Sequence, residues 1–201
     1  MIKNVVFDYG QVLIEFNTAY MTAQYVSAPE DAKLVEEVIF DRLYWDPLDR
    51  DGISDEELLA DSFRRLPERL WEQAKQVYDN WFYHNPEIEG MSQLMRDLKA
   101  EGYHIFVLSN ISKTFAAHAH EIPILRNAEH CILSGAHGLA KPQREIFELL
   151  CRECDILPQE SIFIDDNPAN IRAAEDFGIQ GYLFDGDVAA LRNYFHLNKE
   201  N

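Results

Sequence analysis

The chain opens with a mainly apolar run, Ile2 to Phe7, that stops at Asp8. A short run of this kind is typical of a central strand that is buried on both faces. It would deliver the Asp8 carboxylate at its carboxyl end, where Gly10 would let the backbone turn sharply and approach a ligand. A single strand-end Asp is also explained as a turn cap. The interpretation of Asp8 therefore depends on the rest of the chain.

Between residues 14 and 86 the pattern is helical. Apolar residues at spacings of three and four predict helices over 19–26, 32–40, 54–66 and 68–82. Ser54 and Glu57 have the spacing of a capping box, which marks the start of the third helix. Residues 44–52, rich in aromatic and charged groups, predict a loop. Residues 15–85 are thus predicted to form an all-helical cap inserted after the first strand.

From Pro86 onward helices and strands alternate. Strands are predicted over 103–108, 130–133, 161–164 and 181–184, and helices over 88–101, 114–120, 143–154, 168–177 and 188–195. This alternation is typical of a doubly wound parallel sheet with right-handed crossovers. We therefore predict an α/β protein. Residues 1–14 and 86–201 would form a Rossmann-like core, and residues 15–85 the cap domain.

The charge balance narrows the range of partners. Eighteen basic residues against 35 acidic residues give a formal charge of -17, which repels nucleic acid and anionic lipid surfaces. We therefore expect a small-molecule substrate, no nucleic-acid or membrane partner, and a monomer or weak homodimer.

The sequence also bears on the compartment. It shows no basic leader with an apolar core and no apolar run near ~18 residues, so we expect a cytoplasmic protein. Three cysteines, an odd number, fit a reducing compartment. The Cys151-x-x-Cys154 pair is interpreted as helix core thiols.

Polar residues recur where the predicted strands end. They are Asp8, Ser109-Asn110, Lys141 and Asp165-Asp166. In an open parallel sheet ligands bind outside the carboxyl ends of the strands. Two carboxylates ~4 Å apart repel by about 4 kcal/mol at an effective dielectric near 20, and a hard cation relieves this. Oxygen ligands with room for water and phosphate suit Mg²⁺.

The same residues suit phosphoryl transfer. Asp8 would attack a phosphate, Lys141 would add a fixed positive charge, and Ser109 with Asn110 would hold the phosphate oxygens. Hydrolysis of the aspartyl phosphate would follow. Each of these motifs alone is also explained as a helix cap, a turn or a surface loop. Their order and their placement at strand ends together favour a shared site.

The chain also resembles a known superfamily. The motifs Phe7 to Val12, Leu108-Ser109-Asn110, Lys141-Pro142 and Phe163 to Asn167, with a helical cap between the first two, resemble the haloacid dehalogenase-like hydrolases over nearly the whole chain. Asp-x-Gly-x-Val at the first motif is similar to bacterial phosphatases of sugar phosphates such as α-D-glucose 1-phosphate. The run from Asp49 to Ser54 is similar to that subgroup too.

The resemblance implies roles for the site residues. Asp8 would be the nucleophile and a Mg²⁺ ligand, with the Gly10 carbonyl and Asp166 as further ligands. Asp165 would be another ligand or be oriented through water. Ser109 and Lys141 would bind phosphate, with Asn110 beside them.

Gly10 departs from the pattern of many family phosphatases, which have a second Asp there that protonates the leaving oxygen. Such help is worth about 10²- to 10⁴-fold. Either the substrate has a good leaving group, such as an anomeric phosphate, or a cap residue supplies the proton. The candidates for that role are Asp46, Asp49, Glu15 and His84.

Aromatic residues of the cap divide into two groups. Tyr44 and Trp45 are candidates for substrate contact, and Trp71, Trp81 and Phe82 are assigned to the cap core, which also explains Trp45. The predicted substrate-binding set is Gly10, Trp45, Ser109, Asn110 and Lys141.

The sequence therefore predicts a Mg²⁺-dependent phosphatase of a small metabolite, such as a sugar 1-phosphate. Carbon–halogen hydrolysis by the same nucleophile without a metal is one alternative. The acid pair Asp165-Asp166 disfavours it, because halide would leave beside uncompensated anions. A catalytically weak sugar-phosphate binder is the other alternative.

Overall fold

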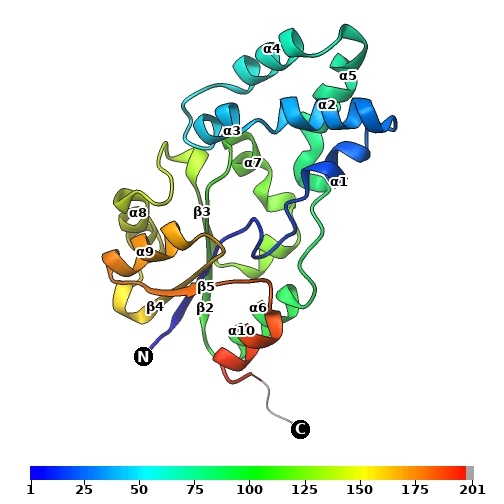
Figure 1. The fold of residues 1–201 in the computed structure, drawn as a ribbon. Coiled ribbons are helices and arrows are strands. Elements are labelled where there is room, and N and C mark those ends of the chain that lie inside the picture. Colours follow the sequence, from blue (N-terminus) through cyan, green and yellow to red (C-terminus); the bar gives the residue numbers. More distant parts are fainter. Residues whose placement is uncertain (198–201) are drawn as a thin grey trace.

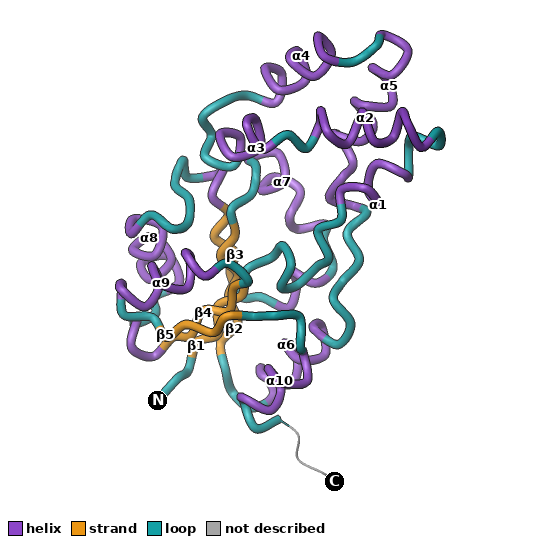
Figure 2. Tube along the Cα trace, in the orientation of Figure 1, coloured by secondary structure: helices purple, strands orange, loops and turns teal. Residues whose placement is uncertain are grey.

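The protein is described by a computed structural model of residues 1–197; residues 198–201, the end of the predicted core segment 86–201, lie outside the described residues. Its centre is a five-stranded parallel sheet in the order β3-β2-β1-β4-β5. The strands are β1 (Asn4–Phe7), β2 (His104–Ser109), β3 (His130–Leu133), β4 (Ser161–Asp165) and β5 (Gln180–Leu183). The predicted α/β fold is confirmed, with β1 at the middle of the sheet (Figures 1 and 2).

Helices cover both faces of the sheet because side chains alternate along each strand. Val5 packs in one apolar cluster with α6 (Met91–Ala100) and α10 (Val188–Tyr194). Val6 packs in a second cluster with α8 (Arg144–Cys154) and α9 (Pro168–Phe177). Both valines are fully buried, which contributes about 1.5–3 kcal/mol each to folding. Burial on both faces explains why the first strand is a nearly continuous apolar run.

Residues 15–85 contain no strand, and an isolated β-bridge between Ile14 and Glu87 joins the two chain segments that flank them. They form α1 (Thr18–Ala23), α2 (Pro29–Ile39), α3 (Arg42–Leu48), α4 (Asp55–Arg65) and α5 (Trp71–Asn80), with 3-10 turns Glu68–Leu70 and Trp81–Tyr83. The predicted capping box is present at Ser54 and Glu57. Figure 1 shows these helices beyond the carboxyl ends of the strands.

The prediction of a loop over residues 44–52 is wrong, because residues 42–48 form α3. The Asp41 side chain accepts the Leu43 N–H and so caps the first turn. Pro47 has no N–H to donate to the preceding turn, and α3 ends at the next residue, Leu48. Seven residues are too short a stretch for helical periodicity to be visible in the sequence.

The sharp turn after β1 is not made by Gly10. Gln11, with φ of 58°, is the residue in the left-handed region, whereas Gly10 is outside it. A Cβ atom added to Gly10 would meet no other atom within 4 Å. Backbone geometry and space therefore do not require glycine at position 10.

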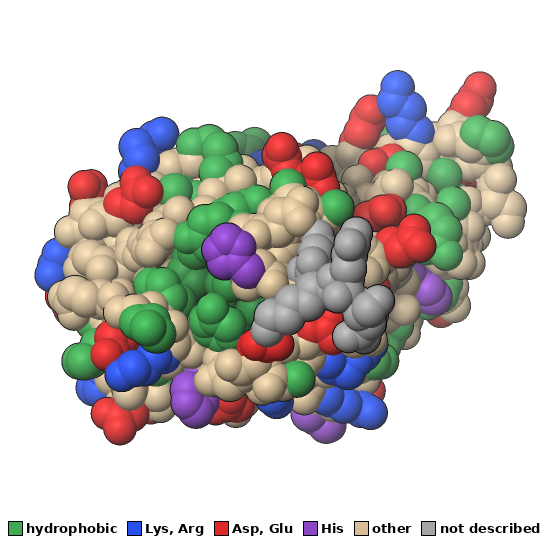
Figure 3. Space-filling model, turned by 90° about the horizontal axis from the view of Figure 1, so that it is seen from below, with side chains coloured by type: hydrophobic (Ala, Val, Ile, Leu, Met, Phe, Trp, Pro, Cys, Tyr) green, Lys and Arg blue, Asp and Glu red, His purple; other side chains and the backbone are tan. Residues whose placement is uncertain are grey.

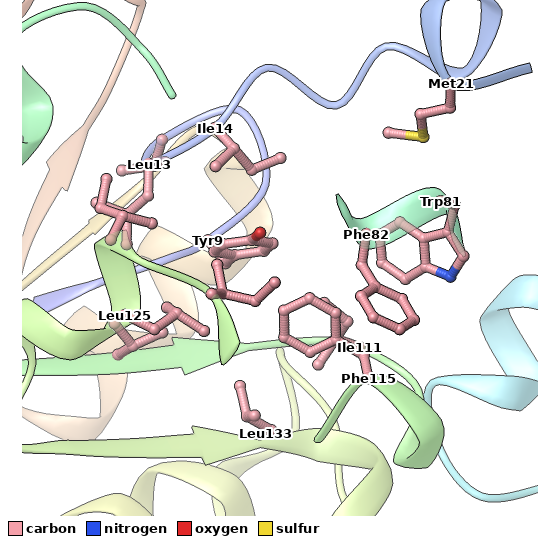
Figure 4. Close-up of a cluster of buried hydrophobic side chains, with 14 of the residues drawn as sticks. Tyr9, Leu13, Ile14, Met21, Trp81, Phe82, Ile111, Phe115, Leu125 and Leu133 are labelled. Carbon is pink, nitrogen blue, oxygen red and sulfur yellow. The ribbon is translucent and has the colours of Figure 1, made fainter. Parts of the chain in front are cut away.

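An apolar cluster joins the strand ends to the cap. The Tyr9 ring lies 5.1 Å from Phe115 of α7 (Lys113–His118), and Phe115 stacks on Trp81 at 5.6 Å. Figure 4 shows these rings together with Phe82, between the β1 turn and the cap. Trp81 and Phe82 are thus buried, as predicted for cap core residues, whereas the same prediction is wrong for Trp71, which is 38% exposed.

Charged side chains on the face seen from below in Figure 1 are of both signs and are spread around its margin (Figure 3). Hydrophobic side chains gather nearer its centre. Among residues 1–197 no helix combines the length and the apolar character needed to cross a bilayer.

We expect Gly135→Ala to lower the free energy of unfolding by about 3 kcal/mol, the upper end of the range for overpacking. An added Cβ would lie 2.4 Å from the Lys113 amide nitrogen and 2.6 Å from the Ser112 carbonyl carbon, so α7 would have to move. Gly10→Ala is the matched control and should change stability by less than about 1 kcal/mol. Urea unfolding of both variants measures this. Equal stability of the two would contradict the packing around Gly135.

Candidate active site

The sheet order brings the predicted residues to one point. Because β1 lies between β2 and β4, Asp8, Ser109 and Asp165 end three adjacent strands. The Asp8 N–H donates to the Ile164 carbonyl at 2.9 Å, which continues the ladder past the end of β1. The chain also reverses its direction of winding at β1, and such switch points form ligand crevices in open sheets.

A cavity of about 500 Å³ opens at this switch point. Its volume is within the range of small-molecule sites. The sequence-predicted residues that line it are Asp8, Gly10, Trp45, Ser109, Asn110, Lys141 and Asp166, together with the proton-donor candidates Asp46 and Asp49.

Lys141 is the electrostatic centre of the site. Its Nζ lies 2.8 Å from Asp8 Oδ1 and 2.7 Å from Asp165 Oδ2, and its side chain is 1% exposed. Burial by itself would lower the pKa of Lys141, but the two carboxylates outweigh it and the pKa is raised. Lys141 is therefore a permanent cation beside Asp8.

Asp165 is fully buried and its oxygens are already engaged. Besides Lys141, Oδ1 accepts the Asn167 N–H at 2.7 Å, and Asn170 Nδ2 is 3.1 Å from each oxygen. This arrangement favours a role in positioning Lys141 over a role as a direct cation ligand.

Asp8 has one engaged and one open oxygen. Oδ1 accepts the Tyr9 N–H at 2.7 Å in addition to the Lys141 contact. Oδ2 has no hydrogen-bond partner within residues 1–197. Burial raises the pKa of Asp8 to about 6; Lys141 opposes the rise and Asp165 adds to it. The open oxygen faces a cavity and is free to bind a cation or attack a substrate.

The carboxylates fit a hard divalent cation. Asp8, Asp165 and Asp166 offer oxygens that all lie within 4.8 Å of one another. With Asp165 engaged, Asp8 and the exposed Asp166 are the free pair. Burial raises the pKa of Asp166, and the charge of Asp165 raises it further, which is the sign of excess negative charge. Oxygen donors in such a field suit Mg²⁺.

The two phosphate-binding candidates on β2 differ in what they contact. Asn110 clamps the backbone of Lys141: its Nδ2 donates to the Lys141 carbonyl at 2.9 Å, and its Oδ1 accepts the Lys141 N–H at 2.7 Å. The Ser109 hydroxyl lines the cavity without a hydrogen-bond partner in the described part of the chain. Ser109 is therefore available to an anion, and Asn110 holds the loop that carries Lys141.

Comparison with protein families gives a match to the haloacid dehalogenase-like hydrolase model over residues 2–178. The chain belongs to this family. It is similar to D-ribitol-5-phosphate phosphatase of Bacteroides thetaiotaomicron, with 25% identity over 90% of this chain and 91% of the relative.

Two solved structures of this family show the same fold. A family enzyme of Bacteroides thetaiotaomicron, in complex with magnesium and inorganic phosphate, aligns with a TM-score of 0.72 at 20% identity, over 99% of this chain and all of that one. L-2-haloacid dehalogenase of Xanthobacter autotrophicus aligns with a TM-score of 0.64 at 17% identity, over 90% of this chain and 76% of that one.

The two aromatic candidates for substrate contact, Trp45 and Tyr44, are both packed against other side chains of residues 15–85. Trp45 is 5% exposed, stacks on Phe40 at 5.2 Å and donates its indole N–H to the Ile39 carbonyl. It forms part of the cavity wall. The Arg65 guanidinium lies over the Tyr44 ring, 5.5 Å from the ring centre. Tyr44 is not part of the cavity wall.

Several residues of the site were not singled out from the sequence. They are Arg42, Arg50 and Asn170 in the cavity lining, and Ser134, which bonds the lining residue Ile111. Trp81, which was assigned to the cap core, also forms part of the wall. The sequence could have indicated Asn170, because it lies in the first turn of the helix that follows Asp165. The others come from the cap or from a β3 turn, and nothing in their local pattern marks them.

The Cys151-x-x-Cys154 pair lies away from the site on α8 and is packed against the second apolar cluster. Burial raises the pKa of Cys151 to about 11 and that of Cys154 to about 12. Protonated thiols are poor nucleophiles and poor metal ligands. A structural role as core thiols agrees with this environment.

Proposed function

We propose that this hydrolase is a Mg²⁺-dependent phosphatase of a small phosphorylated metabolite, in particular a sugar phosphate such as a sugar 1-phosphate. The observation that carries the proposal is the open Oδ2 of Asp8 beside a buried lysine. The similarity to a phosphatase of a phosphorylated polyol over nearly the full chain supports the substrate class.

In this mechanism Asp8 Oδ2 attacks phosphorus in line with the leaving oxygen and forms an aspartyl phosphate. Lys141 and the Ser109 hydroxyl hold the transferred phosphoryl oxygens, where negative charge would otherwise repel the nucleophile. Asp8, Asp166 and the Gly10 carbonyl would hold the Mg²⁺, which neutralises charge on the phosphoryl group when bound. Water then hydrolyses the aspartyl phosphate.

The cavity supports a substrate with a polar, non-reacting part. Trp45 and Trp81 contribute apolar wall, while Arg42, Arg50 and Gln11 contribute polar groups that a sugar hydroxyl could bind. The two arginines also offset the negative field of a chain with a formal charge of -17. Trp45 would contact the substrate at the cap side.

Dehalogenation remains the alternative to test. The acid pair argues less strongly against dehalogenation than the sequence suggested, because Lys141 compensates the charge of Asp165; among residues 1–197 only Asp166 of the pair lacks an ion-pair partner. Metal dependence is therefore the property that separates the two reactions.

We also propose a cytoplasmic monomer or weak homodimer that acts on a small molecule. The negative charge and the reduced, partly buried cysteines support this assignment. Sedimentation over a range of protein concentrations measures the oligomeric state.

A panel of sugar 1-phosphates, sugar 6-phosphates and polyol phosphates tests the function, with phosphate release measured in Mg²⁺ and in EDTA. We expect release on at least one class, loss of it in EDTA, and recovery when Mg²⁺ is restored. A 2-haloacid is assayed in parallel for halide. Halide release that persists in EDTA, without phosphate release, would replace the phosphatase assignment.

A further inference from the structure

Phosphoryl transfer to Asp8 leaves one proton without an assigned donor. A sugar or polyol oxygen leaves as an alkoxide unless a nearby group protonates it, and the water that follows needs a base. Gly10 has no side chain that could donate a proton. In the proposed mechanism Asp8 is the nucleophile and binds the cation, and Asp166 is a further ligand of the cation. The donor must therefore come from another ionisable group in the wall of the cavity.

Three of the four proton-donor candidates predicted from the sequence are poorly placed to protonate a leaving group in the cavity. Glu15 is exposed and is not part of the cavity wall. His84 is also outside the wall, and its Nε2 is 2.8 Å from the Tyr25 hydroxyl. Asp46 lies at the rim with a side chain 59% exposed and pairs with Arg42 at 3.3 Å. Asp49 is the remaining carboxyl group.

Asp49 is fixed at the end of α3 from two sides. Its N–H donates to the Trp45 carbonyl at 2.9 Å, and its own carbonyl accepts the Ser134 hydroxyl at 2.5 Å. The Ser134 oxygen also accepts the Ile111 N–H at 2.7 Å, next to the Ser109-Asn110 pair. The same hydroxyl therefore holds the cap residue and the phosphate-side loop together.

The Asp49 carboxyl differs from the other carboxyl groups of this wall. Its Oδ1 is buried and, among the described residues, has no hydrogen-bond partner. A buried carboxylate oxygen without a partner is costly, so this environment favours the protonated, neutral form of Asp49, which is the form that a general acid requires. The side chain shares the cavity with Asp8, Ser109 and Lys141.

The charges around Asp49 suit a group that must gain and lose a proton near neutrality. Burial raises the pKa of Asp49 to about 7. Arg42 and Arg50 lower that pKa, while Asp46 and Asp8 raise it. A general acid is most effective when its pKa lies near the working pH.

We propose that Asp49 is the general acid and base of this enzyme, in place of a side chain at position 10; the inference rests on the proposed phosphatase function. As the Asp8 Oδ2–phosphorus bond forms and the bond from phosphorus to the leaving oxygen breaks, the Asp49 proton passes to that oxygen. The Asp49 carboxylate then takes a proton from the water that attacks phosphorus. The bond from phosphorus to Asp8 breaks, and inorganic phosphate leaves. Because the proton is supplied by the protein, esters of ordinary sugar and polyol hydroxyls are substrates, as well as anomeric phosphates.

Two esters of different leaving-group basicity test this role. For Asp49→Asn we expect kcat/KM to fall about 10²- to 10⁴-fold on a sugar 6-phosphate, but less than about 10-fold on p-nitrophenyl phosphate, whose phenolate leaves without a proton. In wild type kcat/KM on the sugar phosphate should decline above about pH 7, because Asp49 loses the proton it must donate, and Asp49→Asn should lack this decline. Asp51→Asn is the matched control, since Asp51 is exposed, outside the cavity and 3.6 Å from Lys113, and its rates should stay at the wild-type level.

Each other outcome has a defined meaning. An equal loss on both esters would overturn the role of Asp49 in proton transfer, and so would selective loss in Asp46→Asn instead. Hydrolysis of p-nitrophenyl phosphate by wild type, absent from Asp8→Asn, supports the phosphatase function whatever Asp49→Asn does. Absence of any hydrolysis by wild type would overturn both the function and the inference.

Discussion

Asp8→Asn should reduce phosphate release by about 10⁴-fold or more, as removal of a covalent nucleophile does in other enzymes. The amide nitrogen or oxygen that would replace the open Oδ2 cannot form a stable acyl phosphate. The Tyr9 N–H and Lys141 can keep their contacts with the remaining oxygen. The loss of activity should therefore come without loss of structure, and the thermal unfolding midpoint should not fall.

Asp185→Asn is the matched control for Asp8→Asn. Asp185 also follows a strand, β5, but at the edge of the sheet, where it accepts the Asp187 N–H at 3.2 Å outside the cavity. Its variant should release phosphate at the wild-type rate. Substantial turnover by Asp8→Asn, measured in Mg²⁺ on the best substrate of the panel, would contradict the assignment of the nucleophile.

Lys141→Met should abolish activity and also lower the free energy of unfolding by about 3–5 kcal/mol, the usual cost of removing one partner of a buried ion pair. Asp8 and Asp165 would be left as buried carboxylates without their shared cation. Protonation relieves their repulsion, so the loss of stability should be smaller at pH 5 than at pH 7.

Urea unfolding of Lys141→Met, of Lys113→Met and of the double variant Lys141→Met with Asp165→Asn measures this effect. Lys113 forms an exposed pair with Asp51 at 3.6 Å, and its loss should cost less than about 1 kcal/mol. The double variant should recover part of the stability because one carboxylate is gone. Equal stability of the two lysine variants would mean that Lys141 is not the shared cation.

Much of the core followed from local pattern. Helix α9 and strand β3 begin and end where the sequence predicts, because a buried strand and an amphipathic helix each have a period that a few residues reveal. The conformation of the turn after β1 and the helix α3 could not be predicted from the local pattern. Gln11 rather than Gly10 takes the left-handed conformation, and α3 is too short and too rich in aromatic residues to show its period.

The sequence by itself determined that Asp8, Ser109, Lys141 and Asp165-Asp166 would meet, since parallel strands deliver their carboxyl ends to one edge. Only the tertiary structure decided which of their oxygen atoms are already bonded within the protein. Asp165 proved to be engaged by Lys141 and Asn170, so that Asp8 and Asp166 are left for a cation.

The tertiary structure also distinguished Asp49 from Asp46, Glu15 and His84. Its position depends on Ser134, 85 residues away, and no local pattern encodes a contact of that range. Strand ends are set by the geometry of one sheet, whereas the placement of a side chain in residues 15–85 depends on how those helices pack against segments far away in the sequence.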